Sequence, residues 1–120
     1  MGDQFALFRS LLDHTSDGIE VVDPETGRFV DVNQSACRAH GYTRDEYLRL
    51  RVPEIDARMS EQAWFESREK LRSGAPVVQS GRHRRKDGSV FDVELSAVWV
   101  KDGRDYILTI VRDISARTRA

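Results

Sequence analysis

Apolar and polar residues alternate along residues 90–100, and this pattern constrains the fold more than any other feature of the chain. The odd-numbered positions are apolar and hold Phe91, Val93, Leu95, Ala97 and Trp99. Successive side chains of a β-strand point to opposite faces of a sheet, so the pattern predicts a long strand whose odd-numbered face is buried. Turn sequences at 86–88 and 102–103 separate it from apolar segments at 77–84 and 106–114. The C-terminal part is therefore predicted to form three antiparallel strands.

The N-terminal half contains a second pair of strand signals. Residues 19–22 and 29–32 are rich in apolar and β-branched side chains, and residues 23–27 between them read Asp-Pro-Glu-Thr-Gly. In a turn, proline presets φ and glycine permits a positive φ. A β-hairpin is therefore predicted over residues 19–32.

Two short helices are predicted between the hairpin and the C-terminal strands. Asn33 is placed to cap the first helix, because its side-chain oxygen can accept an N–H of the first turn, and Gly41 is placed to end it. Thr43 and Glu46 match the capping box, in which each side chain accepts the backbone N–H of the other residue. These signals predict a second helix that begins after Thr43.

The segment that follows has weaker signals and then a stronger one. Residues 50–57 contain Pro53 and show no steady period, which predicts a loop or a single helical turn. Ser60 is placed to cap a longer helix, and Gly74 is placed to end it. The order of strands and helices predicts an α+β fold with one antiparallel sheet.

The two ends of the chain differ from its middle. Phe5, Phe8 and Leu12 recur at helical spacing, so residues 1–15 are predicted to form an amphipathic helix. Residues 16–114 are predicted to form the core domain. The polar and basic segment 115–120 is predicted to be the start of a linker to an output domain.

Size and charge exclude several classes of protein. The chain has 120 residues, which is the size of one domain, and 19 basic against 20 acidic residues give a net charge of −1. Such a charge does not attract DNA or an anionic membrane, so no nucleic-acid partner is expected. No apolar segment is long enough for membrane insertion. Cys37, the only cysteine, fits a reducing compartment, so a cytoplasmic location is expected.

Five short motifs resemble the PAS sensory domain of bacterial signal-transduction proteins. They occur in the family's order: Asp-Gly-Ile at 17–19, Val-Val-Asp at 21–23, His-Gly-Tyr-Thr-Arg at 40–44, Lys-Asp-Gly-Ser at 86–89 and Val-Arg-Asp-Ile-Ser at 111–115. Each is weak alone, but together they span almost the whole chain. The resemblance implies a five-stranded antiparallel sheet whose concave face is covered by short helices, with a small-molecule pocket between them.

The resemblance also implies roles for individual residues. The implied pocket is formed by Glu20, Val22, Cys37, His40, Trp64, His83, Val93, Leu95, Ala97 and Thr109. Signal transmission to the linker is implied for Asp113, Ile114 and Ser115. A homodimer is implied, through Phe5, Phe8 and Leu12 of the N-terminal helix and Leu108 and Ile110 of the outer sheet face.

No cofactor can be assigned from the sequence. A photoactive flavin domain of this family needs a reactive cysteine within the region of residues 51–56, and a haem domain needs a histidine on the long helix, within 60–73; neither is present. Neither haem nor photoactive flavin is therefore expected. Cys37 is interpreted as a buried core residue. No spacing typical of metal ligands and no catalytic set of residues is found, so the domain is not expected to be an enzyme.

Two titratable residues of the implied pocket have alternative interpretations. Glu20 either holds a cationic or hydrogen-bonding group of a ligand, or forms an internal ion pair, or lies in water through a shift of register. His83 either reads the protonation of a ligand or is a strand histidine that is satisfied or half-exposed. The basic residues of 82–86 are interpreted as a solvated strand end.

The predicted function is that of a regulatory domain. It binds a small molecule or mediates dimerisation, and it transmits a signal to a C-terminal output domain, expected to be a histidine kinase. The alternatives are an output domain of the diguanylate cyclase or phosphodiesterase type, and a ligand-free protein-interaction module with a filled core.

Overall fold

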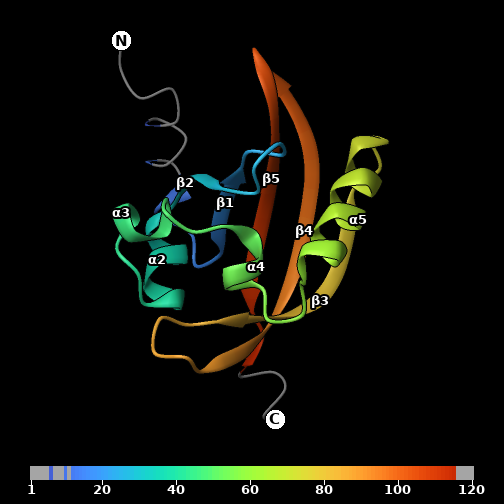
Figure 1. The fold of residues 1–120 in the computed structure, drawn as a ribbon. Coiled ribbons are helices and arrows are strands. Elements are labelled where there is room, and N and C mark those ends of the chain that lie inside the picture. The colour runs from blue at the N-terminus through green and yellow to red at the C-terminus, as the bar shows by residue number, and fades with distance from the viewer. Residues whose placement is uncertain (1–5, 7–9, 11, 116–120) are drawn as a thin grey trace.

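A computed structural model describes residue 6, residue 10 and residues 12–115, which form one antiparallel sheet with helices inserted between its second and third strands (Figure 1). The five strands are β1 (Gly18–Val22), β2 (Phe29–Val32), β3 (Val77–Arg84), β4 (Val90–Asp102) and β5 (Arg104–Asp113). The helices are α2 (Gln34–His40), α3 (Arg44–Tyr47), α4 (Val52–Ile55) and α5 (Glu61–Arg72). The predicted α+β class and five-stranded sheet are confirmed.

The order of the strands joins the two ends of the domain at the centre of the sheet. The order is β2-β1-β5-β4-β3, and each neighbouring pair is antiparallel. Strand β5 pairs with β1 from Gly18 opposite Val111 to Val22 opposite Ile107. The hairpin β1–β2 and the meander β3–β4–β5 therefore form a single sheet, and β5 contacts both.

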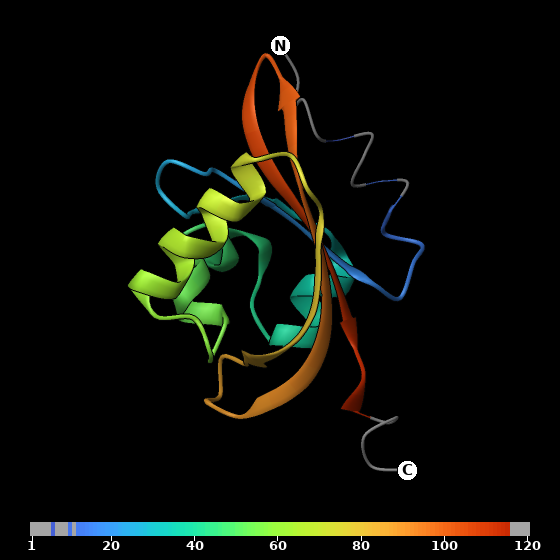
Figure 2. The ribbon, with the colours of Figure 1, turned by 90° about the vertical axis from the view of Figure 1, so that its right-hand side faces the viewer.

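The helices lie on one side of the curved sheet (Figure 2). Helix α2 approaches β1 so closely that a Cβ atom at Gly18 would lie 3.2 Å from the Cα atom of Ala36, which explains the glycine at this position. The main core joins this sheet face to the helices and includes Val22, Phe29, Ala36, Tyr47, Ile55, Trp64, Leu71 and Ile107.

The local helix signals are confirmed atom by atom. The Asn33 side chain accepts the N–H of Ala36, and Gly41 follows α2 with φ +80°. Thr43 and Glu46 form both hydrogen bonds of the capping box at the start of α3. These caps set the direction in which α2 and α3 cross the sheet, because they satisfy N–H groups that a helix start leaves without partners.

The segments with weaker sequence signals agree only partly with the predictions. Residues 52–55 of the segment predicted to be a loop or one turn form the single turn α4, and Ser60 caps α5. On β4, Phe91, Val93 and Leu95 are buried as predicted, whereas Ala97 and Trp99 are half-buried. Strand β4 extends beyond the predicted end to Asp102. Most of the predicted helix over 1–15, including Phe5 and Phe8, lies outside the described residues.

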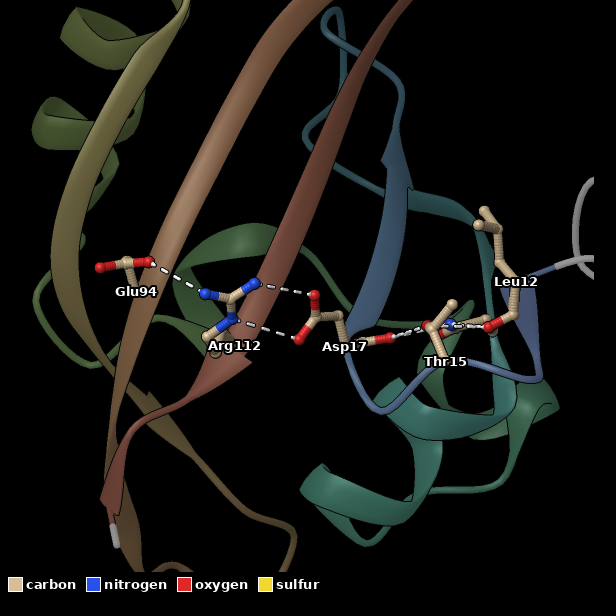
Figure 3. Close-up of polar contacts among 6 residues, drawn as sticks. Leu12, Thr15, Asp17, Glu94 and Arg112 are labelled. Atoms are coloured by element: carbon tan, nitrogen blue, oxygen red, sulfur yellow. Dashed lines mark hydrogen bonds and ion pairs between the residues drawn. The ribbon is translucent and has the colours of Figure 1, made fainter. Parts of the chain in front are cut away.

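Polar contacts hold the segment before β1 to the sheet. The Asn33 side-chain amide donates to the carbonyls of Leu12 and Asp17, at 3.1 and 3.0 Å. On the face of β5 away from the helices, the Arg112 guanidinium lies between Asp17 at 3.4 Å and Glu94 at 3.9 Å (Figure 3). Within the described part of the chain, the helices are too short or too polar to cross a bilayer.

Candidate functional site

An internal cavity of about 60 Å³ lies between the sheet and helices α4 and α5. Its wall is mostly apolar, and Glu20 of β1 and His83 of β3 contribute titratable side chains to it. A cavity of this size has room for several waters or a small organic group. The combination of an apolar wall with a few polar groups is typical of small-molecule sites.

The structure places seven of the ten predicted pocket residues in this wall. They are Glu20, Val22, Trp64, His83, Leu95, Ala97 and Thr109. The wall also contains residues that the sequence analysis did not include: Val52, Asp56, Met59, Ser67, Leu71, Val77, Gln79 and Ile107. Several of these come from α4 and the residues after it, whose lack of periodicity gave no indication of an inward face.

The other three predicted pocket residues do not line this cavity. Cys37 packs in the main core, and Val93 packs beside Phe91 and Val111 in a second core cluster. Their assignment to the pocket wall is corrected because α2 lies directly against this end of the sheet and fills the space there. His40 is fully buried behind His83, and it contributes to the site through a hydrogen bond instead.

Four buried side chains form a continuous hydrogen-bonded chain from β1 to β3. The Tyr47 hydroxyl donates to the Glu20 carboxylate and lies 3.3 Å from Nδ1 of His40. His40 Nδ1 is 2.7 Å from the carbonyl oxygen of Ala36, and His40 Nε2 is 2.8 Å from Nδ1 of His83. A carbonyl can only accept, so Nδ1 of His40 carries a proton, and Nε2 of its neutral ring accepts from His83.

Each member of this buried chain is placed by a local feature of the sequence. Glu20 alternates with apolar Ile19 and Val21 on β1 and so shares the inward face with Val22. His40 lies one helical turn after Ala36, which is why its ring reaches that carbonyl. His83 pairs with Phe91 on β4 and therefore lies on the buried face of the meander.

Burial keeps the interior groups largely uncharged. Desolvation raises the pKa of Glu20 to about 7, although the Tyr47 hydrogen bond acts in the opposite direction. Burial lowers the pKa of His40 to about 4, and burial together with neighbouring His40 lowers the pKa of His83 to about 3. Both imidazoles are therefore neutral at pH 7, whereas Glu20 is poised between its two protonation states.

These partners decide between the interpretations of Glu20 and His83. Glu20 is 4% exposed, which excludes a position in water, and its hydrogen-bond donor is a phenol rather than the cation of an internal ion pair. His83 is 3% exposed and bonded to His40, so it is a satisfied histidine rather than a half-exposed one. Burial also raises the pKa of the Cys37 thiol, in agreement with its interpretation as a core residue.

Among the described residues, the fold brings together a grouping of metal-binding residue types that the sequence spacing did not predict. Ligand atoms of Glu20, His40 and His83 all lie within 4.8 Å of one another. These residues are 20 and 43 positions apart, so the grouping depends on the strand order and on the packing of α2, and no local motif could reveal it. The expectation of no metal site rested on sequence spacing alone, which does not describe this grouping, and it stays a prediction.

A groove on the surface adjoins the cavity. It lies between α5 and β3 and shares five residues with the wall of the cavity: Asp56, Met59, Ser67, Val77 and Gln79. Met59 and Val77 are only partly buried. The shared wall marks the side from which a ligand would reach the interior.

The residues predicted for signalling and dimerisation lie elsewhere. Asp113 ends β5, and its carboxylate accepts the N–H of Ser115 at 2.9 Å, while the N–H of Ile114 bonds to β4. Leu108 is half-buried and Ile110 is 39% exposed on the other face of β5. Phe5 and Phe8 lie outside the described residues, so dimerisation stays a prediction.

Known proteins resemble both the sequence and this fold. A curated methyl sulfide methyltransferase-associated sensor from Methanosarcina acetivorans is 28% identical over 118 residues. The match covers 94% of this chain but only 11% of that protein. The chain therefore corresponds to a small part of this relative.

Solved structures match over most of their length. A domain of a sensory box sensor histidine kinase/response regulator from Geobacter sulfurreducens is 34% identical with a TM-score of 0.78, covering 92% of this chain and 94% of that one. The PAS domain of an HTR-like protein from Haloarcula marismortui is 27% identical with a TM-score of 0.82, covering 91% and 90%. Residues 16–116 match the family model for the PAS domain, and the chain therefore belongs to the PAS domain family.

Proposed function

We propose that this PAS domain senses a small molecule in the cavity bounded by Glu20 and His83. The observation that carries the proposal is the cavity itself, whose mostly apolar wall includes the buried titratable side chains of Glu20 and His83. A carboxyl poised near neutrality can donate or accept a hydrogen bond, and the neutral His83 ring offers Nε2 as an acceptor. The ligand class is therefore a small, uncharged or cationic molecule with at least one polar group.

The route from the cavity to an output domain follows β5 in this proposal. Ile107 and Thr109 line the cavity, and the same strand ends at Asp113, whose carboxylate holds the N–H of Ser115. A ligand that favours one packing of β5 shifts the population of that C-terminal joint. The similarity to a histidine kinase domain supports a histidine kinase as the output domain, in a cytoplasmic homodimeric protein.

The test of ligand binding compares two substitutions on β4. Ala97→Leu fills the cavity, whereas Val98→Leu enlarges the neighbouring side chain on the other face. Purified proteins are denatured and extracted, and the extracts are analysed by small-molecule mass spectrometry. We expect a compound in the wild type and in Val98→Leu that Ala97→Leu lacks. An identical profile for all three proteins would contradict the proposal.

Transmission is tested separately in the full-length protein. Asp113→Ala removes the acceptor of the Ser115 N–H and leaves the cavity unchanged. We expect ligand affinity to stay within about twofold while the response of the output activity to ligand is lost. Full retention of regulation would refute the role of the joint. Assays of the same full-length protein for kinase, cyclase and phosphodiesterase activity identify the type of output domain.

A second candidate function rests on the small volume of the cavity. Because the cavity measures only about 60 Å³, the interior is close to filled, as expected for a module that acts only through protein contacts. Extracts without any bound compound, together with unchanged regulation by Ala97→Leu, would favour this ligand-free interaction module.

A further inference from the structure

We propose that Glu20, His40 and His83 form a binding site for a divalent transition-metal ion such as Zn²⁺ at the inner end of the cavity. All three residues are buried, and their ligand atoms lie within 4.8 Å of one another. Two imidazoles and one carboxylate are a donor set that zinc accepts, with a fourth position left for water or another ligand. The inference does not depend on the cavity taking an organic molecule.

The orientation of His40 is that of a prepared metal ligand. Its Nδ1–H is held by the Ala36 carbonyl at 2.7 Å, so the lone pair of Nε2 points toward His83. Metal-bound histidines usually donate their other ring N–H to a carbonyl or carboxylate, which fixes the ring and its tautomer. In this chain that outer hydrogen bond is already in place.

Glu20 has a comparable outer partner. The Tyr47 hydroxyl bonds one carboxylate oxygen, Oε2, and leaves the other oxygen, Oε1, for a metal ion. Asp56 lines the same cavity and adds a second buried carboxyl group close to Glu20. Two carboxylates would balance the charge of a divalent ion in an interior that is otherwise apolar.

Binding requires the ligand atoms, which lie within 4.8 Å of one another, to move by up to about 1.5 Å. Ligand atoms of a tetrahedral zinc site lie roughly 3.3 Å apart, given zinc-to-ligand distances of about 2.0 to 2.1 Å. His40 Nε2 and His83 Nδ1 are 2.8 Å apart, so the ion would replace the shared proton and separate the two rings by about half an ångström. The proton of the neutral His83 ring then moves from Nδ1 to Nε2 by exchange with water, so the ring stays neutral and its Nδ1 lone pair is available to the ion.

The donor set also limits the metal. Imidazole nitrogen suits Zn²⁺, Co²⁺, Ni²⁺ and Cu²⁺, whereas Mg²⁺ and Ca²⁺ prefer oxygen ligands only. The cavity beside Glu20 and His83 supplies space for the open coordination position. A metal bound there would present that position to any molecule that enters from the groove between α5 and β3.

The test titrates the whole chain, freed of metal with a chelator, with Zn²⁺ by calorimetry and with Co²⁺ by visible absorption. His14 supplies a matched control, because it is the remaining histidine and is exposed. We expect one ion per chain in the wild type and in His14→Ala. Glu20→Gln and His83→Asn, which preserve much of the side-chain volume and hydrogen bonding, should weaken Zn²⁺ binding at least tenfold.

Thermal unfolding keeps the proposal testable if a variant folds poorly. Zn²⁺ should raise the melting temperature of the wild type and of His14→Ala but not that of Glu20→Gln, since an ion bound only by the folded state stabilises it. Mg²⁺ should leave all melting temperatures unchanged. Failure of the wild type to bind Zn²⁺ at 1:1, or equal binding by Glu20→Gln and His83→Asn, would overturn the proposal. A loss of binding in His14→Ala would also overturn it.

Discussion

Two polar clusters, one on each face of the sheet, show how position changes what polar groups do. The buried chain of Glu20, Tyr47, His40 and His83 lies between the helices and the sheet. Burial there raises the pKa of the two acids and lowers the pKa of the two histidines, so that each shift favours the neutral form. On the other face, the Arg112 side chain is 52% exposed and pairs with Asp17 and Glu94 across more than 3 Å (Figure 3). Water screens the second cluster but not the first.

The two clusters therefore contribute differently to stability. An exposed ion pair tolerates the loss of a partner because water replaces it, whereas a buried donor or acceptor without a partner is costly. The interior chain therefore fixes one arrangement of β1, α2, α3 and β3. The surface cluster orients the segment before β1. Breaking it should cost little free energy of unfolding.

The largest effect is expected at Tyr47, which is fully buried and holds Glu20. Tyr47→Ala removes a large aromatic ring that packs edge-on against Phe29 and His40, and it should destabilise the domain by roughly 3 to 5 kcal/mol. Denaturant unfolding measures the change. Phe65→Ala is the control, because Phe65 is 49% exposed and its loss should have an effect within about 0.5 kcal/mol. Equal losses would contradict the comparison.

The next largest effect is the change in stability with pH that the Glu20 carboxyl causes. Its pKa is raised in the folded state, so the folded protein holds this proton more tightly, and the stabilisation is lost as pH rises from 4.5 to about 7. The loss attributable to Glu20 should total roughly 3 kcal/mol, and Glu20→Gln should abolish it. His40 and His83 contribute in the opposite direction, since their lowered pKa values make unfolding easier in acid.

The measurement is therefore a difference between two proteins. Unfolding free energies of the wild type and of Glu20→Gln are compared at a series of pH values, so that the histidine contributions largely cancel. Tyr47→Phe sharpens the test, because losing the phenol should raise the pKa of Glu20 further and extend the fall to higher pH. Parallel curves for the wild type and Glu20→Gln would show that Glu20 is not buried as described.

A smaller effect is expected where the two regions meet, at Asn33. Its side chain accepts the N–H groups of Ile19 and Ala36 and donates to two carbonyls before β1. Asn33→Ala should cost roughly 2 to 3 kcal/mol, because it removes a helix cap and leaves buried groups without partners. Ser60→Ala, which removes only a cap, should cost about 1 kcal/mol. A cost for Asn33→Ala no larger than this would show that its contacts before β1 contribute nothing.

The smallest effect is expected at Arg112. Arg112→Ala should lower the denaturant midpoint less than Asn33→Ala does, and the difference from wild type should vanish at high salt because exposed charges are screened. Denaturant unfolding at low and high salt measures it. A large change that persists in salt would mean that the surface cluster is as important for stability as the buried chain.

The sequence predicted the fold far better than the site. The caps at Asn33, Thr43 and Ser60 depend on residues three positions apart, and the alternation over 90–100 needs only the geometry of one strand. Such signals depend only on residues that are close together in the sequence, so they can be recognised without the structure. The hairpin and the meander could therefore be placed before the structure was known.

The site depends on contacts that no local pattern encodes. Val52, Asp56 and Met59 line the cavity because a single irregular turn folds inward, and His40 meets His83 because α2 lies over the meander. Cys37 and Val93 were assigned to the pocket because they face inward, but inward-facing residues at that end of the sheet contact packed core instead. Facing the core and lining a cavity are distinguished only by the packing of the helices.

Nitrogen NMR of histidine-labelled protein tests the central claim most directly, which is that His83 of the cavity wall and His40 behind it form a neutral, hydrogen-bonded pair. At pH 7, we predict neutral rings for His40 and His83, with the proton of His40 on Nδ1 and no titration of either ring between pH 5 and pH 8. A charged imidazolium at either position at pH 7, or a proton on Nε2 of His40, would contradict the account.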